Sequence, residues 1–443
     1  MPLAQNLRIA FATPEYVTEK PFDCGLATYI HRVGKALVDL GHEVHVITLS
    51  QAESEFEHDG VRVHRVKVAR IWLQLSRLTR YRLADSLYLL GLSAGVYRKL
   101  KELNRRHRFD LIQFPYCPYC GLVSMFFLRV PHVIRASWYE AAWNDLTNTT
   151  PRLDRRIIGA LERLQLRFSP HVCTPSQSLR KTLTERRGLS DVRVIPSPVY
   201  VETADWDYAK YEELLRGKKY LLFFGRFELR KGFQVLCQAL PRFLERETGA
   251  CAVFVGRDLA SSLAPSMAEY ARSLLSAYGD RVLIIDRLSH ALLYPIIEQA
   301  QLVVLPSLMD NLPNACLEAM ALGKVVLGTR GASFEEMISD GENGFLVTPD
   351  SPDELAEKIL AAWTNPRLDA IGRAAREKAR DYAPEHTVKT LLAYYQEVLN
   401  ENGESPGGVG TDLSGVLVNG AVDEHTGRVR TVRNWWSRGG SNP

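Results

Sequence analysis

Two carboxylates eight residues apart, Asp310 and Glu318, are the side chains whose type and spacing first suggest chemistry. Asp310 precedes an apolar run and Glu318 lies inside it; the run ends at Gly323, a residue type that commonly stops a helix. We therefore expect one acid in a loop and the other about two turns into a helix. Such a pair can bind hydroxyl groups, but it is also typical of helix capping or of a solvated surface.

A second chemical segment is the loop from Gly225 to Gly232, which holds Arg226 and Lys231. A guanidinium offers forked hydrogen bonds and an ammonium offers a point charge, so this pair suits a diphosphate. No Gly-Lys-Ser/Thr follows, and no G-x-G-x-x-G occurs in the chain, which disfavours a Walker loop and a dinucleotide fingerprint. The competing interpretation is a solvated charged turn.

Two further loops have a related character. Gly25 opens an expected helix, whose first backbone N–H groups can receive a phosphate, although glycine before a helix is common. The segment from Thr329 to Glu336 is expected to begin another helix after a strand. Three of these loops belong to the second half of the chain and are expected to line one edge of a sheet.

The elements that must position these loops alternate between strands and helices. Strands are expected at residues 7–13, 43–48, 110–114, 132–135, 172–174 and 192–195, and again at 220–224, 252–255, 282–285, 302–305 and 325–327. Helices are expected at residues 27–40, 231–247, 352–363, 368–382 and 384–399. This alternation predicts an α/β fold with parallel sheets covered by helices.

The pattern stops near residue 198 and restarts near 220, with a polar connection between, which predicts two similar α/β domains. The expected division is an N-terminal domain at 1–198 and a C-terminal domain at 199–383. A helix at 384–400 follows, and the Gly- and Ser-containing tail at 401–443 is expected to be disordered.

The composition indicates a soluble, cytoplasmic protein: 46% of its 443 residues are hydrophobic, 24% are charged, and no signal peptide or spanning segment is visible. Seven scattered cysteines favour a reduced compartment, and Cys117 and Cys120 have metal-site spacing without the second pair that zinc needs. The net charge of +4 gives no reason to expect nucleic acid. Basic stretches between Arg62 and Arg108 and between Arg152 and Arg167 are interpreted as solvated helix faces or as a surface for anionic membrane lipid.

Taken together, these residues resemble the retaining glycosyltransferases of family 4, which have the GT-B architecture of two Rossmann-like domains facing a cleft. The resemblance covers residues 7–400. It is carried by the helix opened by Gly25, by residues 175–180, by Gly225, Arg226, Lys231 and Gly232, by Asp310 and Glu318 with Gly323, and by residues 341–347.

The resemblance implies a donor site for a nucleotide diphosphate sugar. Arg226 and Lys231 are expected to hold the diphosphate, Glu318 the ribose and Asp310 the donor sugar, and these two cations with Asp310 are the expected catalytic residues. The full set of expected donor contacts is Gly25, Arg226, Lys231, Asp310, Asn311, Leu312, Pro313, Asn314 and Glu318. The helix at 384–400 is expected to pack back on the N-terminal domain.

Two positions depart from the family pattern. Asp310 stands where the family has a longer glutamate, which is expected to alter the preference for the donor sugar. Ser137 stands where the family often has a histidine, so it is a possible contact to the acceptor or the sugar, and His132 does not take over that role.

The expected function is therefore retaining sugar transfer from a UDP- or GDP-sugar to a glycan, lipid-linked or small-molecule acceptor, without a metal or a cofactor. Peripheral association with the inner face of an anionic membrane is a further expectation. Three alternatives stay open: a GT-B epimerase or phosphorylase, a nucleotide-sugar-binding protein without turnover, and a nicotinamide-dependent oxidoreductase, which the missing G-x-G-x-x-G disfavours.

Overall fold

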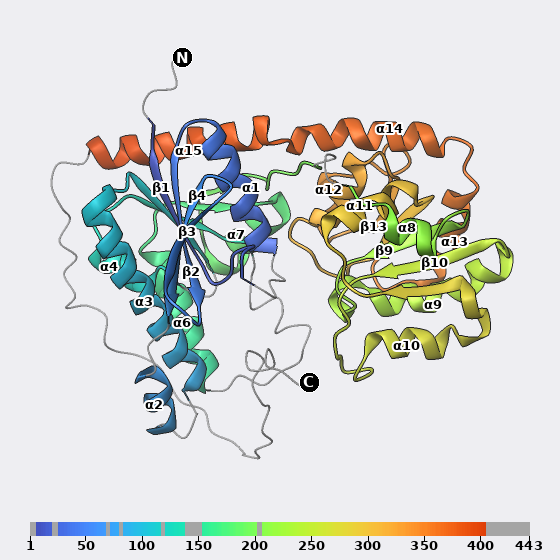
Figure 1. Ribbon diagram of the computed structural model, residues 1–443, viewed down its shortest axis with the longest axis horizontal. Coiled ribbons are helices and arrows are strands. Elements are labelled where there is room, and N and C mark those ends of the chain that lie inside the picture. The colour runs from blue at the N-terminus through green and yellow to red at the C-terminus, as the bar shows by residue number, and fades with distance from the viewer. Residues whose placement is uncertain are drawn as a thin grey trace. The chain divides into compact units, whose positions relative to one another are not determined.

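The computed structural model describes residues 6–19, 25–67, 71–78, 83–116, 120–137, 153–201 and 206–404 (Figure 1). Residues up to Gly403 belong to one compact unit. The strands of the described residues form two separate sheets, each dominated by parallel pairs and covered by helices. The predicted α/β class is confirmed.

The first sheet has eight strands in the described residues, in the order β3-β4-β2-β1-β5-β6-β7-β8. Their bounds are β1 Arg8–Thr13, β2 Glu43–Ser50, β3 Ser54–His58, β4 Val61–Lys67, β5 Leu111–Pro115, β6 His132–Arg135, β7 Val172–Thr174 and β8 Val192–Val194. All neighbours pair in parallel except β3 and β4, which are antiparallel. The order reverses direction between β1 and β5.

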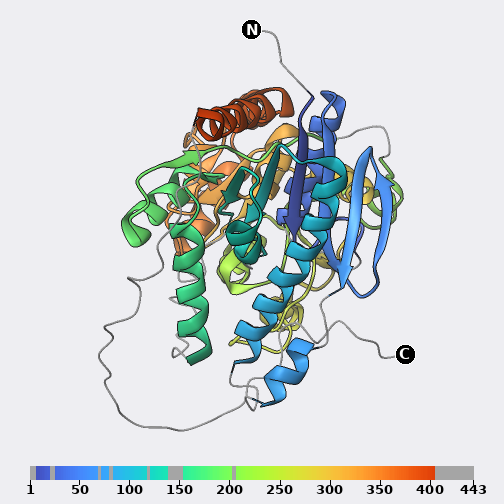
Figure 2. The same cartoon turned by 90° about the vertical axis from the view of Figure 1, so that its left-hand side faces the viewer.

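Helices cover both faces of this sheet. They are α1 Gly25–Asp39, α2 Ile71–Leu78, α3 Ala84–His107, α4 Leu122–Phe127, α6 Leu153–Arg167 and α7 Gln177–Arg187. Alternate residues of a strand point to opposite faces, and in β1 Ile9 and Phe11 join the core beside α1, whereas Ala10 and Ala12 join the core beside α3. Figure 2 shows α3 lying along one face of the sheet.

The second sheet has six parallel strands, in the order β11-β10-β9-β12-β13-β14 within the described residues. Their bounds are β9 Lys219–Phe224, β10 Ala250–Val255, β11 Val282–Ile285, β12 Leu302–Leu305, β13 Val326–Thr329 and β14 Phe345–Val347. The strand order reverses between β9 and β12. In open sheets of this kind, ligands bind outside the carboxyl ends of the strands at such a reversal.

The second half contains the helices α8 Ala209–Leu214, α9 Phe233–Arg246, α10 Met267–Leu274, α11 His290–Gln299, α12 Asn314–Ala321, α13 Pro352–Trp363, α14 Leu368–Ala379 and α15 Pro384–Glu404. Short 3₁₀ turns are η1 Leu229–Lys231, η2 Ser276–Arg281, η3 Phe334–Glu336 and η4 Arg380–Tyr382. No helix of the described residues combines the length and the apolar character that crossing a bilayer requires.

The last helix, α15, packs against the first sheet (Figure 1). Val388, Leu391 and Val398 share a core with β1 and α1, and the Tyr395 hydroxyl donates a 2.6 Å hydrogen bond to Gln113 Oε1 on β5. Residues 401–404, predicted as the start of the tail, continue this helix, and the rest of that tail lies outside the described residues.

Three local predictions were wrong. The hairpin of β3 and β4 was missed, although Asp59 and Gly60 both have the positive φ that a tight two-residue hairpin turn requires. The connection before residue 217 contains α8, and the helix expected after Thr329 is the single turn η3, with Ser333 in a left-handed conformation at its start. The other predicted elements are present with shifts of a few residues at their ends.

Candidate active site

The two central strands of the second sheet, β9 and β12, end in the two loops that carry the predicted donor residues. Gly232 lets these loops meet, because its φ is 67° and a Cβ there would lie 1.8 Å from the carbonyl oxygen of Pro306. The loop after β9 therefore packs backbone to backbone on the loop after β12. This contact brings Lys231 to Asp310.

Lys231 and Asp310 form an ion pair between Nζ and Oδ2 at this loop junction. The other Asp310 oxygen accepts a 3.0 Å hydrogen bond from the Asn311 N–H. Burial raises the Asp310 pKa, but the Lys231 ammonium and the Arg230 guanidinium outweigh it and hold that pKa below its usual value. Burial lowers the Lys231 pKa against the opposing attraction of Asp310. Asp310 is thus a carboxylate at neutral pH and not a proton donor.

Arg226, in the same loop as Lys231, is held by Glu228, a residue that the sequence interpretation did not single out. Glu228 Oε1 lies 3.1 Å from Arg226 Nη2 and 2.8 Å from Arg230 Nη2. The backbone carbonyl of Arg230 accepts a 2.9 Å hydrogen bond from the Leu308 N–H of the neighbouring loop. Glu228 therefore bridges two guanidinium groups, and the site contains a third cation, Arg230, next to the two predicted ones.

The N-termini of α1 and α12 meet at the same place. A Cβ on Gly25 would lie 3.5 Å from the side-chain nitrogen of Asn314, which begins α12. Leu312 and Pro313, just before α12, are buried and fix the start of this helix. Helix N-termini carry backbone N–H groups without intrahelical partners and a partial positive charge. Two of them side by side suit an anion.

Glu318, one turn into α12, is paired with Arg32 of α1. Arg32 Nη2 donates a 2.7 Å hydrogen bond to Glu318 Oε1, and only 6% and 8% of the two side chains are exposed. The Arg32 guanidinium also lies 5.8 Å from the centre of the Tyr200 ring, in the connection between the two halves. A carboxylate accepts up to about four hydrogen bonds, so this pair leaves Glu318 further acceptor capacity.

Ser137, which follows β6, contacts the loop after β12 through its main chain. Its carbonyl oxygen accepts a 2.8 Å hydrogen bond from the Asn311 side chain. His132 lies at the other end of β6, with Nδ1 3.4 Å from the Val130 carbonyl.

The Glu336 carboxylate accepts 2.9 Å hydrogen bonds from the N–H groups of Gln177 and Ser178 at the start of α7. The loops after β12 and β13 therefore both contact the first half.

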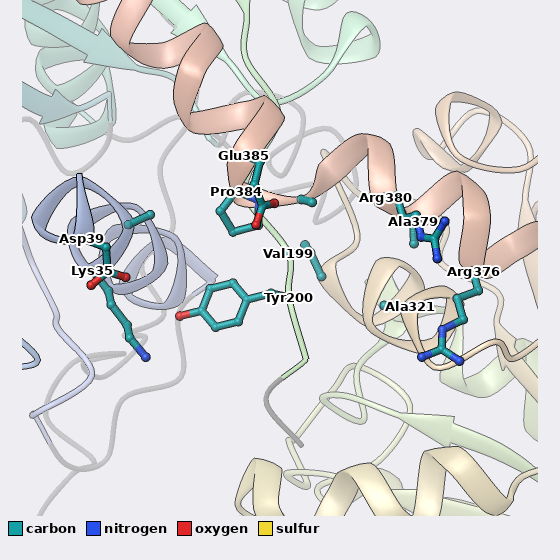
Figure 3. A pocket seen from close by; sticks show the side chains of 12 residues that line it. Lys35, Asp39, Val199, Tyr200, Ala321, Arg376, Ala379, Arg380, Pro384 and Glu385 are labelled. Atoms are coloured by element: carbon teal, nitrogen blue, oxygen red, sulfur yellow. The ribbon is translucent and has the colours of Figure 1, made fainter. Parts of the chain in front are cut away.

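A cavity of about 510 Å³ lies where α1, α12, α14 and α15 meet the connection between the halves (Figure 3). Figure 3 shows Lys35 and Arg376 on opposite sides of Val199 and Tyr200. None of the predicted donor residues is among the described residues that line it.

Cys120 is fully buried, and burial raises its thiol pKa to about 12, whereas Cys117 lies outside the described residues.

Two family models match the chain. Residues 24–198 match the glycosyl transferase 4-like domain, and residues 218–365 match the glycosyl transferases group 1. These ranges together span more than half of the chain. The chain belongs to glycosyltransferase family 4.

The relatives of this family 4 glycosyltransferase agree with that assignment. It is 24% identical over 413 residues to the uncharacterized glycosyltransferase MJ1607 of Methanocaldococcus jannaschii, a match that covers 88% of this chain and 98% of the relative. The sucrose-phosphate synthase of Thermosynechococcus elongatus has a TM-score of 0.69 at 20% identity, covering 89% of this chain and 100% of the other. The Anabaena protein Alr3699/HepE, solved with UDP-glucose, has a TM-score of 0.65 at 18% identity, covering 89% and 100%. The structural likenesses show the GT-B fold.

The structure of this glycosyltransferase brings the predicted residues Gly25, Asn314 and Glu318 to one pair of helices, and Lys231 and Asp310 to one loop junction. Their roles toward a donor stay a prediction. Sequence reasoning missed Arg32, which lies 286 positions from its partner. The available signal was an arginine between Ile30 and Val33, two apolar positions of an expected helix, where burial demands a partner.

Proposed function

We propose that this glycosyltransferase transfers a hexosyl group from a UDP- or GDP-sugar to a glycan, lipid-linked or small-molecule acceptor, without a metal ion. The observation that carries the proposal is that the loops after β9 and β12, which carry Arg226, Lys231 and Asp310, meet at the carboxyl edge of the second sheet, and that the second loop leads into α12, whose N-terminus lies against that of α1. Phosphate oxygens need such a set of donors and positive charge. The UDP-glucose in the similar Anabaena structure supports a nucleotide-sugar donor.

In the proposed reaction the bond between the anomeric carbon and the diphosphate breaks, and the diphosphate leaves with the bonding electrons. Arg226, Lys231 and the helix amides stabilise the charge that develops on its oxygens. The acceptor hydroxyl oxygen forms the new bond to the anomeric carbon, and its proton passes to an oxygen of the departing diphosphate. Retention of the anomeric configuration is proposed from the family assignment.

The two acids are proposed to orient the donor. The Asp310 carboxylate accepts hydrogen bonds from sugar hydroxyls while Lys231, which has three donor hydrogens, spans Asp310 and a phosphate oxygen. Glu318 accepts from the ribose hydroxyls. Arg32 is a positioning residue, because its buried ion pair fixes the Glu318 carboxylate and ties it to the first half of the chain.

A screen of UDP- and GDP-hexoses for release of the nucleoside diphosphate, in the presence of EDTA, tests this proposal. We expect turnover with one donor and its loss in Lys231→Ala. Lys219→Ala is the matched control, because Lys219 is an exposed lysine at the opposite end of β9. Equal turnover in Lys231→Ala would contradict the role of this lysine, and nucleotide binding without turnover of any donor would indicate a binding protein.

We further propose that the enzyme works at an anionic membrane surface. Phe126 and Phe127 on α4 are large exposed apolar side chains, and 70% of Phe127 is exposed. The Phe126 ring packs 4.9 Å from Phe168, just after α6, and α6 carries the exposed cations Arg163 and Arg167. Apolar side chains next to cations suit anionic lipid.

Flotation with vesicles separates this surface from a solvated one. We expect the protein to float with phosphatidylglycerol vesicles and not with phosphatidylcholine vesicles, and Phe127→Asp to weaken flotation. Leu263→Asp is the control, since Leu263 is an exposed leucine of the second half. Equal flotation of Phe127→Asp and the wild type would rule out α4 as the contact.

A further inference from the structure

A group of metal-ligating side chains that are not among the predicted donor residues lies where α1 meets the turn between β3 and β4. His31 Nε2 lies 2.8 Å from Asp59 Oδ2, and His58 Nε2 lies 3.7 Å from the same oxygen. The three side chains offer ligand atoms that all lie within 4.8 Å of one another. No role in sugar transfer uses these residues.

The backbone around this trio is well fixed. Asp59 and Gly60 have φ values of 50° and 75°, which define the tight hairpin turn, and Gly60 packs closely on Val38 of α1. A Cβ on Gly60 would lie 2.6 Å from a methyl carbon of Val38. Because His31 lies on the same helix as Val38, the turn and the helix present their ligands to each other from packed elements.

Tyr16 forms the inner wall of the trio. Its ring is fully buried and lies edge-on to both imidazoles, with centroid distances of 6.1 Å to His31 and 6.2 Å to His58. Among the described residues its buried hydroxyl has no hydrogen-bond partner. On the outer side the Asp59 side chain is 44% exposed, so ions have access from solvent.

The trio offers one carboxylate oxygen and two imidazole nitrogens as ligand atoms. Lys35, one turn along α1 from His31, is a facing cation that opposes a metal.

A second trio in the first half shows what a satisfied cluster looks like. Glu43 Oε1 lies 2.9 Å from His45 Nε2 and 3.2 Å from His107 Nδ1, but it also lies 2.6 Å from Arg62 Nη1. His45 Nδ1 is bonded to His64 at 2.9 Å. A guanidinium already neutralises this carboxylate and both nitrogens of His45 have partners, so the cluster is a hydrogen-bond network.

We propose that His31, His58 and Asp59 bind a borderline divalent cation, zinc above all, through two imidazole nitrogens and one carboxylate. Two imidazoles and a carboxylate are a common zinc donor set, and three protein ligands leave a coordination position for water. The ion would connect the β3–β4 turn to α1 through His31, the residue before Arg32. None of its three ligands is among the predicted donor residues, and the ion takes no part in the proposed phosphate chemistry.

Zinc titration of the untagged, chelator-treated full chain tests this site by calorimetry, with cobalt absorption as the second readout. We expect one zinc per chain and a tetrahedral cobalt spectrum. Because changes to residues around a metal site already weaken binding about 10- to 100-fold, loss of a ligand in His58→Asn or Asp59→Asn should weaken it by about 100-fold or more. His58 and Asp59 are partly exposed, so these variants should keep the fold, as circular dichroism will verify.

The matched control is His107→Gln, which changes the satisfied cluster. Unchanged zinc affinity and cobalt spectrum in His107→Gln, with loss in His58→Asn and Asp59→Asn, would support the assignment. Absence of zinc binding by the wild type would overturn it, as would equal binding in all variants or a loss confined to His107→Gln.

Discussion

The second half of the chain carries most of the predicted donor residues, in two short loops and in α12, whereas the first half contributes single groups. Arg226 and Lys231 share the loop after β9, and Asp310 lies in the loop after β12. From the first half come Gly25 at the N-terminus of α1, the Arg32 side chain and the carbonyl oxygen of Ser137. Substitutions in the second half should therefore change phosphate chemistry, while those in the first half should change stability and the link between the halves.

The largest expected effect is on the Arg32–Glu318 ion pair, which links the two halves of the chain. Arg32→Ala leaves the Glu318 carboxylate buried without its cation, and breaking such a pair typically costs about 3–5 kcal/mol. We expect a loss of that size in the free energy of unfolding, measured by urea denaturation. The double variant Arg32→Met/Glu318→Leu should recover much of it, because both charges are removed.

An exposed pair is the control for Arg32. Arg216 and Glu212 lie 3.1 Å apart with most of the arginine exposed, so Arg216→Ala should change the free energy of unfolding by less than about 1 kcal/mol. Equal effects of Arg32→Ala and Arg216→Ala would show that the buried pair does not couple the halves.

The next effect concerns the second half. Arg226→Ala should lower the turnover number about 100- to 1,000-fold, the range seen when one donor to a developing oxyanion is removed. Arg226→Lys should recover part of this loss, because the charge stays but the forked hydrogen bonds do not. Steady-state kinetics with the best donor will check both, and wild-type turnover in Arg226→Ala would remove this residue from the reaction.

The two halves should also differ in how their stability depends on pH. Burial lowers the pKa of His45, in the first half, to about 4 from an ordinary value of 6.5, so the unfolded chain binds this proton more readily. Stability is then fully present above pH 6.5 and falls as the pH drops toward 4, by about 3 kcal/mol at most.

The measurement is the melting temperature between pH 7 and pH 4. His45→Asn should flatten this dependence, whereas His386→Gln, which alters an exposed histidine at the start of α15, should leave it unchanged. The same acid dependence in His45→Asn and the wild type would assign it to other groups.

The smallest effect is expected at the position that departs from the family pattern. Asp310→Glu adds one methylene, and a change of that size at a binding site shifts specificity by about tenfold. We expect the ratio of kcat/KM values for two competing hexose donors to shift by about that factor, with turnover retained. An unchanged ratio would show that Asp310 does not set the preference for the sugar.

The sequence predicted that the loops of the second half share one edge of the sheet, because the strand topology determines which loops are neighbours. β9 and β12 are neighbouring parallel strands, so their carboxyl ends lie side by side. The loops that carry Lys231 and Asp310 are therefore adjacent. The glycine at 232 was also informative, since its left-handed backbone allows the contact with Pro306.

What the sequence did not reveal depends on packing between distant segments. Arg32 meets Glu318 only once α1 lies along α12, and His31 meets Asp59 only once the missed hairpin is formed. Basic residues of β4 belong to the stretch interpreted as solvated helix faces or as a surface for anionic membrane lipid; Arg62 and Arg65 lie on a strand and pair with acids of the same half. A contact between residues far apart in the chain leaves no pattern that a single sequence shows.

Calorimetry with UDP, GDP and NAD is the direct test of whether Arg226, Lys231 and the two helix N-termini form the proposed nucleoside diphosphate site. We expect UDP or GDP to bind the wild type, Lys231→Ala to weaken this binding by about tenfold or more, and NAD not to bind. Tight binding of NAD with no binding of either nucleoside diphosphate would contradict the proposed site.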